Sequence, residues 1–143
     1  MKKLFTVILT LFILIFCGAS ADAAPQISAH SAILIDAETG RVMFSKSSDE
    51  RLAMASTTKI ITAVTALEID GFDIDRTIEI SENAAGVEGS SMYLQKGEKI
   101  SMRNLLYGLM LSSGNDAAVA IAEAVSGDES AFVELMNKKV GEI

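Results

Sequence analysis

Cysteine, proline, histidine and tryptophan are scarce in this chain of 143 residues. It has one cysteine, one proline, one histidine and no tryptophan. A single cysteine leaves no partner for a disulfide within the chain. Basic residues are also few, with 12 Lys and Arg against 19 Asp and Glu and a formal net charge of −7. This acidic balance argues against nucleic acid as a partner, because binding to a phosphate backbone rests on clustered basic side chains.

The scarcity of histidine also limits the catalytic mechanisms that are open to the chain. His30 is the only histidine, and a Ser-His-Asp triad would have to recruit it. Nothing in the sequence near His30 supports that role, so we interpret it as structural. No group of His, Cys and Asp has metal-ligand spacing. The sequence therefore predicts no metal and no other cofactor.

The first 23 residues are predicted to be a secretory signal peptide. A basic start (Met1-Lys2-Lys3) precedes an apolar run over residues 4–16, and small-x-small sites end at Ala21 and Ala23. We favour cleavage after Ala23, with Ala21 as the alternative. The apolar run is too short for a comfortable membrane span. The mature part, residues 24–143, is then long enough for one domain at most.

Ser56-Thr57-Thr58-Lys59 places a hydroxyl and an amine three residues apart at the head of an apolar run. The apolar residues behind Lys59 recur at helical spacing, and positions three apart share a helix face. A serine hydroxyl needs a neighbouring base to act as a nucleophile at neutral pH, and Lys59 is placed to be that base. The plainer alternative is a capping Ser56 beside a solvated Lys59.

A second motif, Ser113-Gly114-Asn115, follows another apolar helical run. An S-x-x-K element followed by a Ser-x-Asn element is typical of serine penicillin-binding enzymes. Ser81-Glu82-Asn83 also fits Ser-x-Asn, but its context differs, so we take Ser113–Asn115 as the second motif.

With both motifs in this order, the chain resembles the D-alanyl-D-alanine carboxypeptidases, which are low-molecular-weight penicillin-binding proteins of the β-lactamase/transpeptidase-like superfamily. The resemblance runs from about Ala32 to the last residue. It rests on these stretches: Ala32-Ile33-Leu34-Ile35-Asp36, Thr39-Gly40, Ala55-Ser56-Thr57-Thr58-Lys59, Glu88-Gly89-Ser90-Ser91-Met92, Leu105-Leu106-Tyr107-Gly108-Leu109-Met110 and Ser113-Gly114-Asn115-Asp116-Ala117-Ala118. One local departure is Ala53-Met54, because the family usually has a proline shortly before the nucleophile.

The resemblance implies an α+β fold, with helices packed on an antiparallel sheet. It implies that Ser56 attacks the carbonyl carbon of the penultimate D-alanine of a peptidoglycan stem peptide and forms an acyl-enzyme. Lys59 would be the general base, and Ser113 would relay a proton to the leaving D-alanine. Asn115 would bind the substrate amide and orient Lys59. β-Lactams would be covalent inhibitors.

Two other functions stay open. A β-lactamase would share the fold and the acyl-enzyme, but class A β-lactamases have Ser-Asp-Asn where this chain has Ser113-Gly114-Asn115. A non-catalytic penicillin-binding or sensor module is the second alternative, and the joint presence of Ser56, Lys59, Ser113 and Asn115 argues against it.

The sequence also predicts that residues 24–143 are only the N-terminal part of the catalytic domain. No Lys-Thr-Gly follows Asn115, although the family carries this third motif on a strand that lines the site. We therefore expect the fold to be incomplete and the chain alone to be inactive. The family's location implies export to the cell envelope, in the periplasm or on the outer face of the cytoplasmic membrane. Any membrane association would rest on a segment beyond Ile143.

Local patterns predict the elements that carry the motifs. Residues 31–35 and 41–45 read as a β-hairpin, and residues 77–80 as a short strand. Residues 57–69 read as a helix that is apolar around much of its circumference and therefore central. In an incomplete fold we expect its residues Ile60, Ile61, Val64 and Leu67 to be partly uncovered. Ser101 should cap a helix over residues 102–111. The Ala-rich residues 115–125 should form an internal helix, ended by Gly127, and Asp128 should cap a last helix. Four methionines on apolar runs are expected in the core, at positions 92, 102, 110 and 136.

Overall fold

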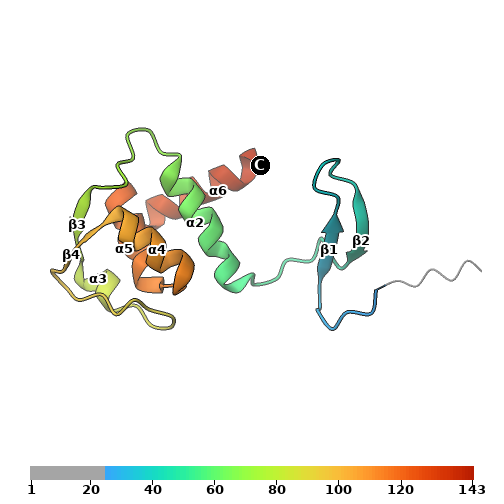
Figure 1. The fold of residues 1–143 in the computed structure, drawn as a ribbon, viewed down its shortest axis with the longest axis horizontal. Coiled ribbons are helices and arrows are strands. Elements are labelled where there is room, and N and C mark those ends of the chain that lie inside the picture. The colour runs from blue at the N-terminus through green and yellow to red at the C-terminus, as the bar shows by residue number, and fades with distance from the viewer. Residues whose placement is uncertain (1–24) are drawn as a thin grey trace, which may run out of the picture. The chain divides into compact units, whose positions relative to one another are not determined.

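The structure is a computed structural model that describes residues 25–143. The predicted signal peptide, residues 1–23, lies outside the described residues. The chain divides into two compact units, one ending at Leu52 and one running from Ala53 to Ile143, and we describe each separately (Figure 1). Among the described residues, no helix has both the length and the apolar character to cross a membrane.

The first unit contains a β-hairpin. Strand β1 (Ala32–Ile35) pairs antiparallel with β2 (Val42–Lys46). The turn between them is held by Asp36, whose carboxylate accepts a hydrogen bond from the Thr39 N–H at 2.8 Å. Gly40 takes the left-handed backbone conformation that the turn requires, with φ +69°. The predicted hairpin is confirmed.

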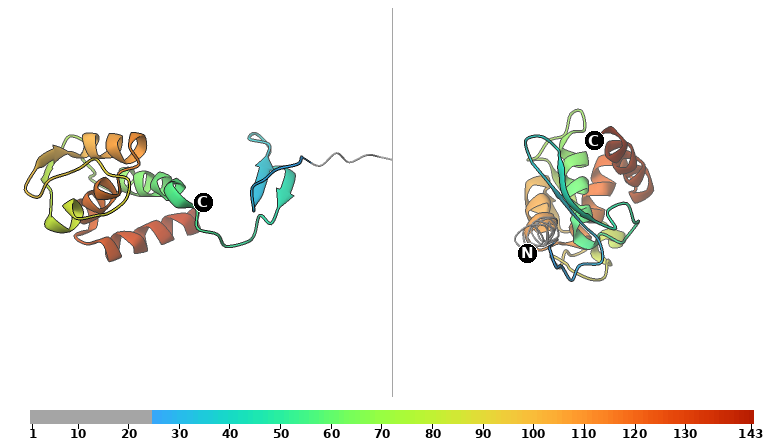
Figure 2. Two further views of the ribbon diagram at one scale, coloured as in Figure 1. Left: turned by 90° about the horizontal axis from the view of Figure 1, so that it is seen from below. Right: turned by 90° about the vertical axis from the view of Figure 1, so that its right-hand side faces the viewer.

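The second unit is mainly helical. In chain order its elements are η1 (Ala55–Thr57), α2 (Thr58–Leu67), β3 (Thr77–Glu79), α3 (Glu82–Ala85), β4 (Lys99–Ser101), α4 (Met102–Leu111), α5 (Asn115–Ser126) and α6 (Glu129–Glu142). Strands β3 and β4 pair antiparallel. Figures 1 and 2 show this pair and α3 at one end of the unit and the C-terminal end of α6 at the other. Helices with small antiparallel sheets make this an α+β fold, as expected.

Side-chain caps set the starts of the helices. The Ser101 hydroxyl accepts a hydrogen bond from a backbone N–H of α4 at 3.3 Å, and the Asp128 carboxylate accepts one from α6 at 2.8 Å. Gly127, with φ +89°, ends α5. These three predictions are confirmed. The short elements α3 and β4 were not expected, although Ser81 caps α3 in the same way at 2.9 Å.

The core of the second unit lies among α2, α4, α5 and α6. Its largest fully buried apolar side chains are Phe132, Met102, Leu105, Leu109 and Ile121. Helix α5 is internal, as predicted, because alanines on its buried side let neighbouring helices approach closely. Ala117 and Ala120 are almost fully buried there.

The structure bears on two expectations about burial. Helix α2 is partly uncovered, as expected for an incomplete fold, because Ile60 is 56% exposed and Leu67 is 49% exposed. Its buried stripe consists of Thr62, Ala63, Thr65 and Ala66. Met110 was expected in the core but is 52% exposed, since it lies at the margin of the buried stripe of α4. Met102 is buried, and Met92 and Met136 pack against the core as predicted.

Candidate functional site

The first motif lies where η1 meets α2. Ser56 is in the single turn of η1, and Lys59 is in the first turn of α2. Ala55, just before Ser56, has φ +48°, which a residue other than glycine adopts only at an energetic cost. The start of a helix carries partial positive charge. The sequence therefore places the Ser56 hydroxyl where negative charge would be stabilised.

The second motif contributes a hydroxyl that contacts the first. Ser113 lies between α4 and α5, and its Oγ donates a hydrogen bond to Ser56 Oγ at 2.7 Å. Ser113 also has positive φ, +55°. A non-glycine residue held in this conformation stores strain, which proteins tend to retain at functional positions. The structure therefore brings together two hydroxyls that are 57 residues apart in sequence.

The Lys59 amine contacts Asn115, the first residue of α5. Lys59 Nζ donates to Asn115 Oδ1 at 2.7 Å. The orientation of the Asn115 amide is fixed from its other side, because Asn115 Nδ2 donates to the Glu88 carbonyl at 2.8 Å. The Asn115 backbone N–H donates to the Ser90 carbonyl at 2.7 Å. The four predicted site residues thus form two hydrogen-bonded pairs, Ser56 with Ser113 and Lys59 with Asn115, and among the described residues no hydrogen bond joins Lys59 to Ser56.

Asp116 is a buried carboxylate beside these pairs, with only 1% of its surface exposed. It accepts hydrogen bonds from Ser91 Oγ at 2.6 Å and from the backbone N–H groups of Met92, Leu94 and Ala117 at 3.0, 3.1 and 2.9 Å. Burial alone would raise the pKa of Asp116. The hydrogen bonds outweigh this effect and hold the pKa below its ordinary value.

Close backbone approach explains two glycines in the site. A Cβ atom on Gly114 would lie 2.8 Å from Asp116 Oδ1 and 3.1 Å from Met92 Cγ. A Cβ atom on Gly89 would lie 2.7 Å from Asn115 Nδ2, and Gly89 also has φ +98°. The glycine between Ser113 and Asn115 is therefore required by contact, and an aspartate there would clash with the buried carboxylate.

The alternative candidates from the sequence, Ser81–Asn83 and His30, have other contacts. Ser81 caps α3, and Asn83 Nδ2 donates to Glu123 Oε1 at 2.9 Å, so Ser81–Asn83 has its own structural role. His30 Nε2 lies 3.0 Å from Glu50 Oε2, and both side chains are largely exposed. Among the described residues, no group of three or more His, Cys, Asp and Glu could hold a metal ion.

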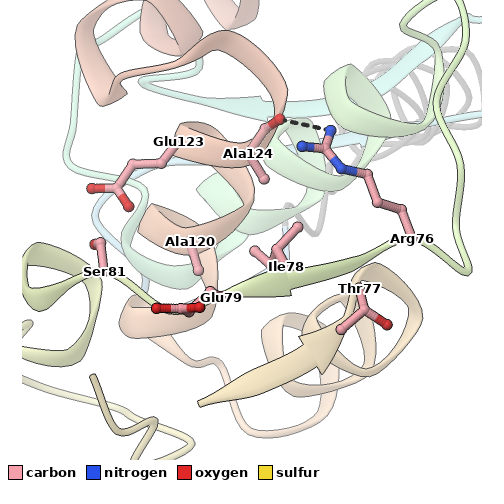
Figure 3. A pocket seen from close by; sticks show the side chains of 8 residues that line it. All are labelled: Arg76, Thr77, Ile78, Glu79, Ser81, Ala120, Glu123 and Ala124. Atoms are coloured by element: carbon pink, nitrogen blue, oxygen red, sulfur yellow. Dashed lines mark hydrogen bonds between the residues drawn. The ribbon is translucent and has the colours of Figure 1, made fainter. Parts of the chain in front are cut away.

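A hollow of about 370 Å³ opens beside the Lys59–Asn115 pair. Apolar side chains of α5 and α6 form much of its wall, including Val119, Phe132 and Met136. A second hollow, of about 350 Å³, is shown in Figure 3. Arg76 and Glu123 are among its lining residues, and none of the four predicted site residues lines it. Of the four predicted site residues, Lys59 and Asn115 line the first hollow, whereas Ser56 and Ser113 do not.

Comparison with known proteins decides the family. Residues 18–143 match the family model described as D-alanyl-D-alanine carboxypeptidase, and this match covers most of the chain. The chain belongs to the D-alanyl-D-alanine carboxypeptidase family.

Relatives in this carboxypeptidase family are similar over about four-fifths of the chain. D-alanyl-D-alanine carboxypeptidase DacF of Bacillus subtilis (strain 168) is 44% identical over 118 residues, which are 80% of this chain and 30% of the relative. The crystal structure of DacD from Francisella tularensis matches with TM-score 0.77 and 41% identity, over 84% of this chain and 30% of that one. Penicillin binding protein 5 from Haemophilus influenzae matches with TM-score 0.77 and 35% identity, over 84% and 37%. The chain thus spans about a third of the length of these carboxypeptidases.

Sequence reasoning singled out the four residues of the candidate site and expected Asn115 to orient Lys59. It did not foresee the Ser56–Ser113 contact or the residues that support the two pairs. Asp116 and the segment 88–92 were noticed only as parts of the resemblance. The available signal was the acidic residue directly after Asn115, at the start of a helix, where a carboxylate is favourable. That it holds a distant loop could be seen only from the fold.

Proposed function

We propose that the whole protein is a serine-type D-alanyl-D-alanine carboxypeptidase acting on peptidoglycan stem peptides, and that its nucleophile, general base and proton relay lie in this chain. One observation supports this above all others. The two motif pairs, Ser56 with Ser113 and Lys59 with Asn115, are each joined by a hydrogen bond of 2.7 Å. Family membership supplies the reaction class for this arrangement.

In the acylation step, Ser56 Oγ attacks the carbonyl carbon of the penultimate D-alanine. The amine of Lys59, in its neutral form, accepts the proton of Ser56. As the C–N bond breaks, Ser113 delivers a proton to the nitrogen of the leaving D-alanine. Its position within hydrogen-bond distance of Ser56 Oγ suits this relay, because the bond that forms and the bond that breaks share one carbon.

In the second step, water cleaves the acyl-enzyme. The same groups remove a proton from the water as it attacks the ester carbon. The ester C–O bond to Ser56 then breaks, Ser56 Oγ takes a proton back, and the shortened stem peptide leaves with a free carboxylate. The negative charge that develops on the carbonyl oxygen in both steps is favoured near the start of α2. Asn115 contributes by fixing the Lys59 amine and by offering its amide to the substrate backbone.

A penicillin-type inhibitor would be attacked in the same way, which makes β-lactams the expected covalent inhibitors. The β-lactamase alternative is disfavoured by Gly114, since the Ser-Asp-Asn form would place a side chain within 2.8 Å of Asp116 Oδ1. A non-catalytic binding module is disfavoured by the strained Ser113, whose cost is hard to explain if its hydroxyl had no chemical role.

The proposed cellular location of the reaction follows from the substrate. Peptidoglycan lies outside the cytoplasm, so we propose that the protein is exported, that residues 1–23 direct this export, and that residues 24–143 form the N-terminal part of the catalytic domain.

Labelling the full-length protein with a fluorescent penicillin tests the proposal. We expect one covalent adduct, which mass spectrometry places on Ser56, and we expect Ser56→Ala to abolish it. The same protein should release D-alanine from a D-Ala-D-Ala peptide and hydrolyse β-lactams much more slowly. An adduct on another residue, or rapid β-lactam turnover without peptide cleavage, would refute the assignment.

Lys59→Ala provides the second test. Because Lys59 is assigned to proton transfer, this variant should lose acylation by about 10²–10⁴-fold while its circular dichroism stays that of the parent. Loss of helical signal would instead make Lys59 a structural residue.

A further inference from the structure

We propose that Asp116 is a positioning residue for this reaction. It holds residues 88–94, here called the 88–94 loop, against the start of α5. The loop in turn fixes the Asn115 amide that contacts Lys59. The inference rests on the proposed function and adds a residue to which neither motif assigns a role.

The first link joins Asp116 to the loop. One carboxylate accepts three hydrogen bonds from residues 22 to 25 positions earlier in the chain: from Ser91 Oγ at 2.6 Å, from the Met92 N–H at 3.0 Å and from the Leu94 N–H at 3.1 Å. A buried carboxylate is costly unless it is fully hydrogen-bonded. Asp116 therefore keeps its place only while the loop keeps this shape.

The second link joins the loop to Asn115. The carbonyls of Glu88 and Ser90, just before the residues that Asp116 holds, accept hydrogen bonds from Asn115 Nδ2 at 2.8 Å and from its backbone N–H at 2.7 Å. Between them, Gly89 has φ +98° and lies so close to the Asn115 amide that a Cβ atom would be 2.7 Å away. The loop backbone thus lies against one side of the Asn115 side chain.

The third link reaches the reacting groups. With Nδ2 committed to the Glu88 carbonyl, Oδ1 of Asn115 faces the other way and accepts the hydrogen bond from Lys59 Nζ at 2.7 Å. In the described part of the chain, the hydrogen bonds of the Asp116 carboxylate go to the loop and to Ala117, not to Ser56, Lys59 or Ser113. In this proposal its effect on the reaction passes through Asn115, which the loop holds and which contacts Lys59.

A plainer role must be separated from this one. A carboxylate in the first turn of a helix stabilises that helix, and Asp116 accepts the Ala117 N–H. If that were all, removing its charge would lower stability and leave the reaction rate of the folded protein unchanged. Asp128 offers a matched control, because its carboxylate caps α6 at 2.8 Å and is not bonded to the 88–94 loop.

The test compares Asp116→Asn with Asp128→Asn in the full-length protein, well below the unfolding temperature of each. We expect Asp116→Asn to slow acylation by labelled penicillin about 10- to 100-fold, the range typical when a catalytic group is displaced by a fraction of an ångström to an ångström. Asp128→Asn should acylate at the parent rate. Equal rates for Asp116→Asn and the parent would overturn the proposal.

A double-mutant cycle with Asn115 gives a readout that a purely structural role would not move. In an Asn115→Ala background the positioned group is gone, so Asp116→Asn should slow acylation less than about twofold further. The same fold-loss in both backgrounds would contradict positioning through Asn115. If Asp116→Asn fails to fold, Ser91→Ala removes one of the three loop contacts and should give a smaller loss in a folded protein.

Failure of the proposed function would be seen separately, as a parent protein that penicillin does not label at Ser56. In that case the side-chain amide protons of Asn115, observed by NMR, still decide the positioning claim. They should shift and exchange faster in Asp116→Asn and not in Asp128→Asn. Unchanged Asn115 signals would overturn the claim whatever the enzyme activity.

Discussion

Ser113 combines a strained backbone conformation with a specific side-chain contact. Its φ of +55° places a non-glycine residue in the left-handed region, while its hydroxyl contacts Ser56 Oγ at 2.7 Å. The left-handed conformation costs an L-residue roughly 1–2 kcal/mol. Such strain is retained where a side chain is needed in one place.

Substituting Ser113 in two ways separates the strain from the hydroxyl. Ser113→Gly should be more stable than Ser113→Ala by about 0.5–1 kcal/mol, because glycine relieves the strain while its larger unfolded-state entropy offsets part of the gain. Both variants should lose most peptidase activity. Denaturant unfolding gives the stability difference, and equal or reversed stabilities would show that Ser113 is not strained.

Gly114 is a residue whose lack of a side chain matters. In Gly114→Ala, the new Cβ would lie 2.8 Å from Asp116 Oδ1 and 3.1 Å from Met92 Cγ, so we expect a loss of about 1–3 kcal/mol together with slower acylation. Gly141→Ala in α6 is the control, since nothing lies within 4 Å of its Cβ. That change should stabilise by about 0.5–1 kcal/mol. Thermal melts of both variants measure the contrast, and equal effects would refute the contact.

At the scale of elements, α4 and the 88–94 loop pack closely where Met92 approaches Gly108. A Cβ on Gly108 would lie 1.7 Å from Met92 Sδ and 2.5 Å from Met92 Cγ, so the methionine side chain covers the bare backbone of the helix. Gly108→Ala should therefore cost about 1–3 kcal/mol. Adding Met92→Ala should recover part of this loss, and strict additivity of the two changes would contradict direct packing.

Elements with a clear local signal were predictable, including the β1–β2 hairpin with its turn, whereas strand β4 was not. The caps Ser101 and Asp128 marked the starts of α4 and α6 because capping depends on a few neighbouring residues. Strand β4 has three residues and exists through its pairing with β3, which no local pattern reveals. The partial exposure of α2 was expected, because its sequence is apolar around more of the helix than the other elements of an incomplete fold can cover.

The candidate site divides in the same way. Ser56, Lys59, Ser113 and Asn115 could be predicted because their chemistry limits both residue type and spacing. Asp116 could not, because its role depends on a loop more than 20 residues away in sequence. Residues that react tend to form recognisable motifs, whereas the residues that hold them depend on the particular fold.

At the scale of the molecule, low pH should lower the stability of the protein by protonating its hydrogen-bonded carboxylates. The folded pKa of Asp116 lies below its ordinary value, against burial, because four donors bind its charged form. A lowered folded pKa contributes stability that is present above about pH 4 and lost as the pH falls through the folded pKa. The pKa values of Asp36 and Glu142 are also lowered, by Thr39 and Lys139 respectively.

Unfolding temperatures measured from pH 7 down to pH 2.5 should therefore stay level and then fall below about pH 4. In Asp116→Asn, the starting stability should be lower and the acid decline shallower, because one of the titrating groups is gone. A decline as steep as that of the parent would show that Asp116 does not contribute to acid sensitivity.

The β1–β2 hairpin is by itself a marginal structure. Apolar side chains of both strands, Ile33, Leu34, Ile35, Val42 and Met43, are each more than half exposed, and an isolated two-stranded hairpin is barely stable in water. The ribosome completes this hairpin before any residue of α2. In the nascent chain these apolar side chains are therefore exposed to water before the helices of the second unit have been made.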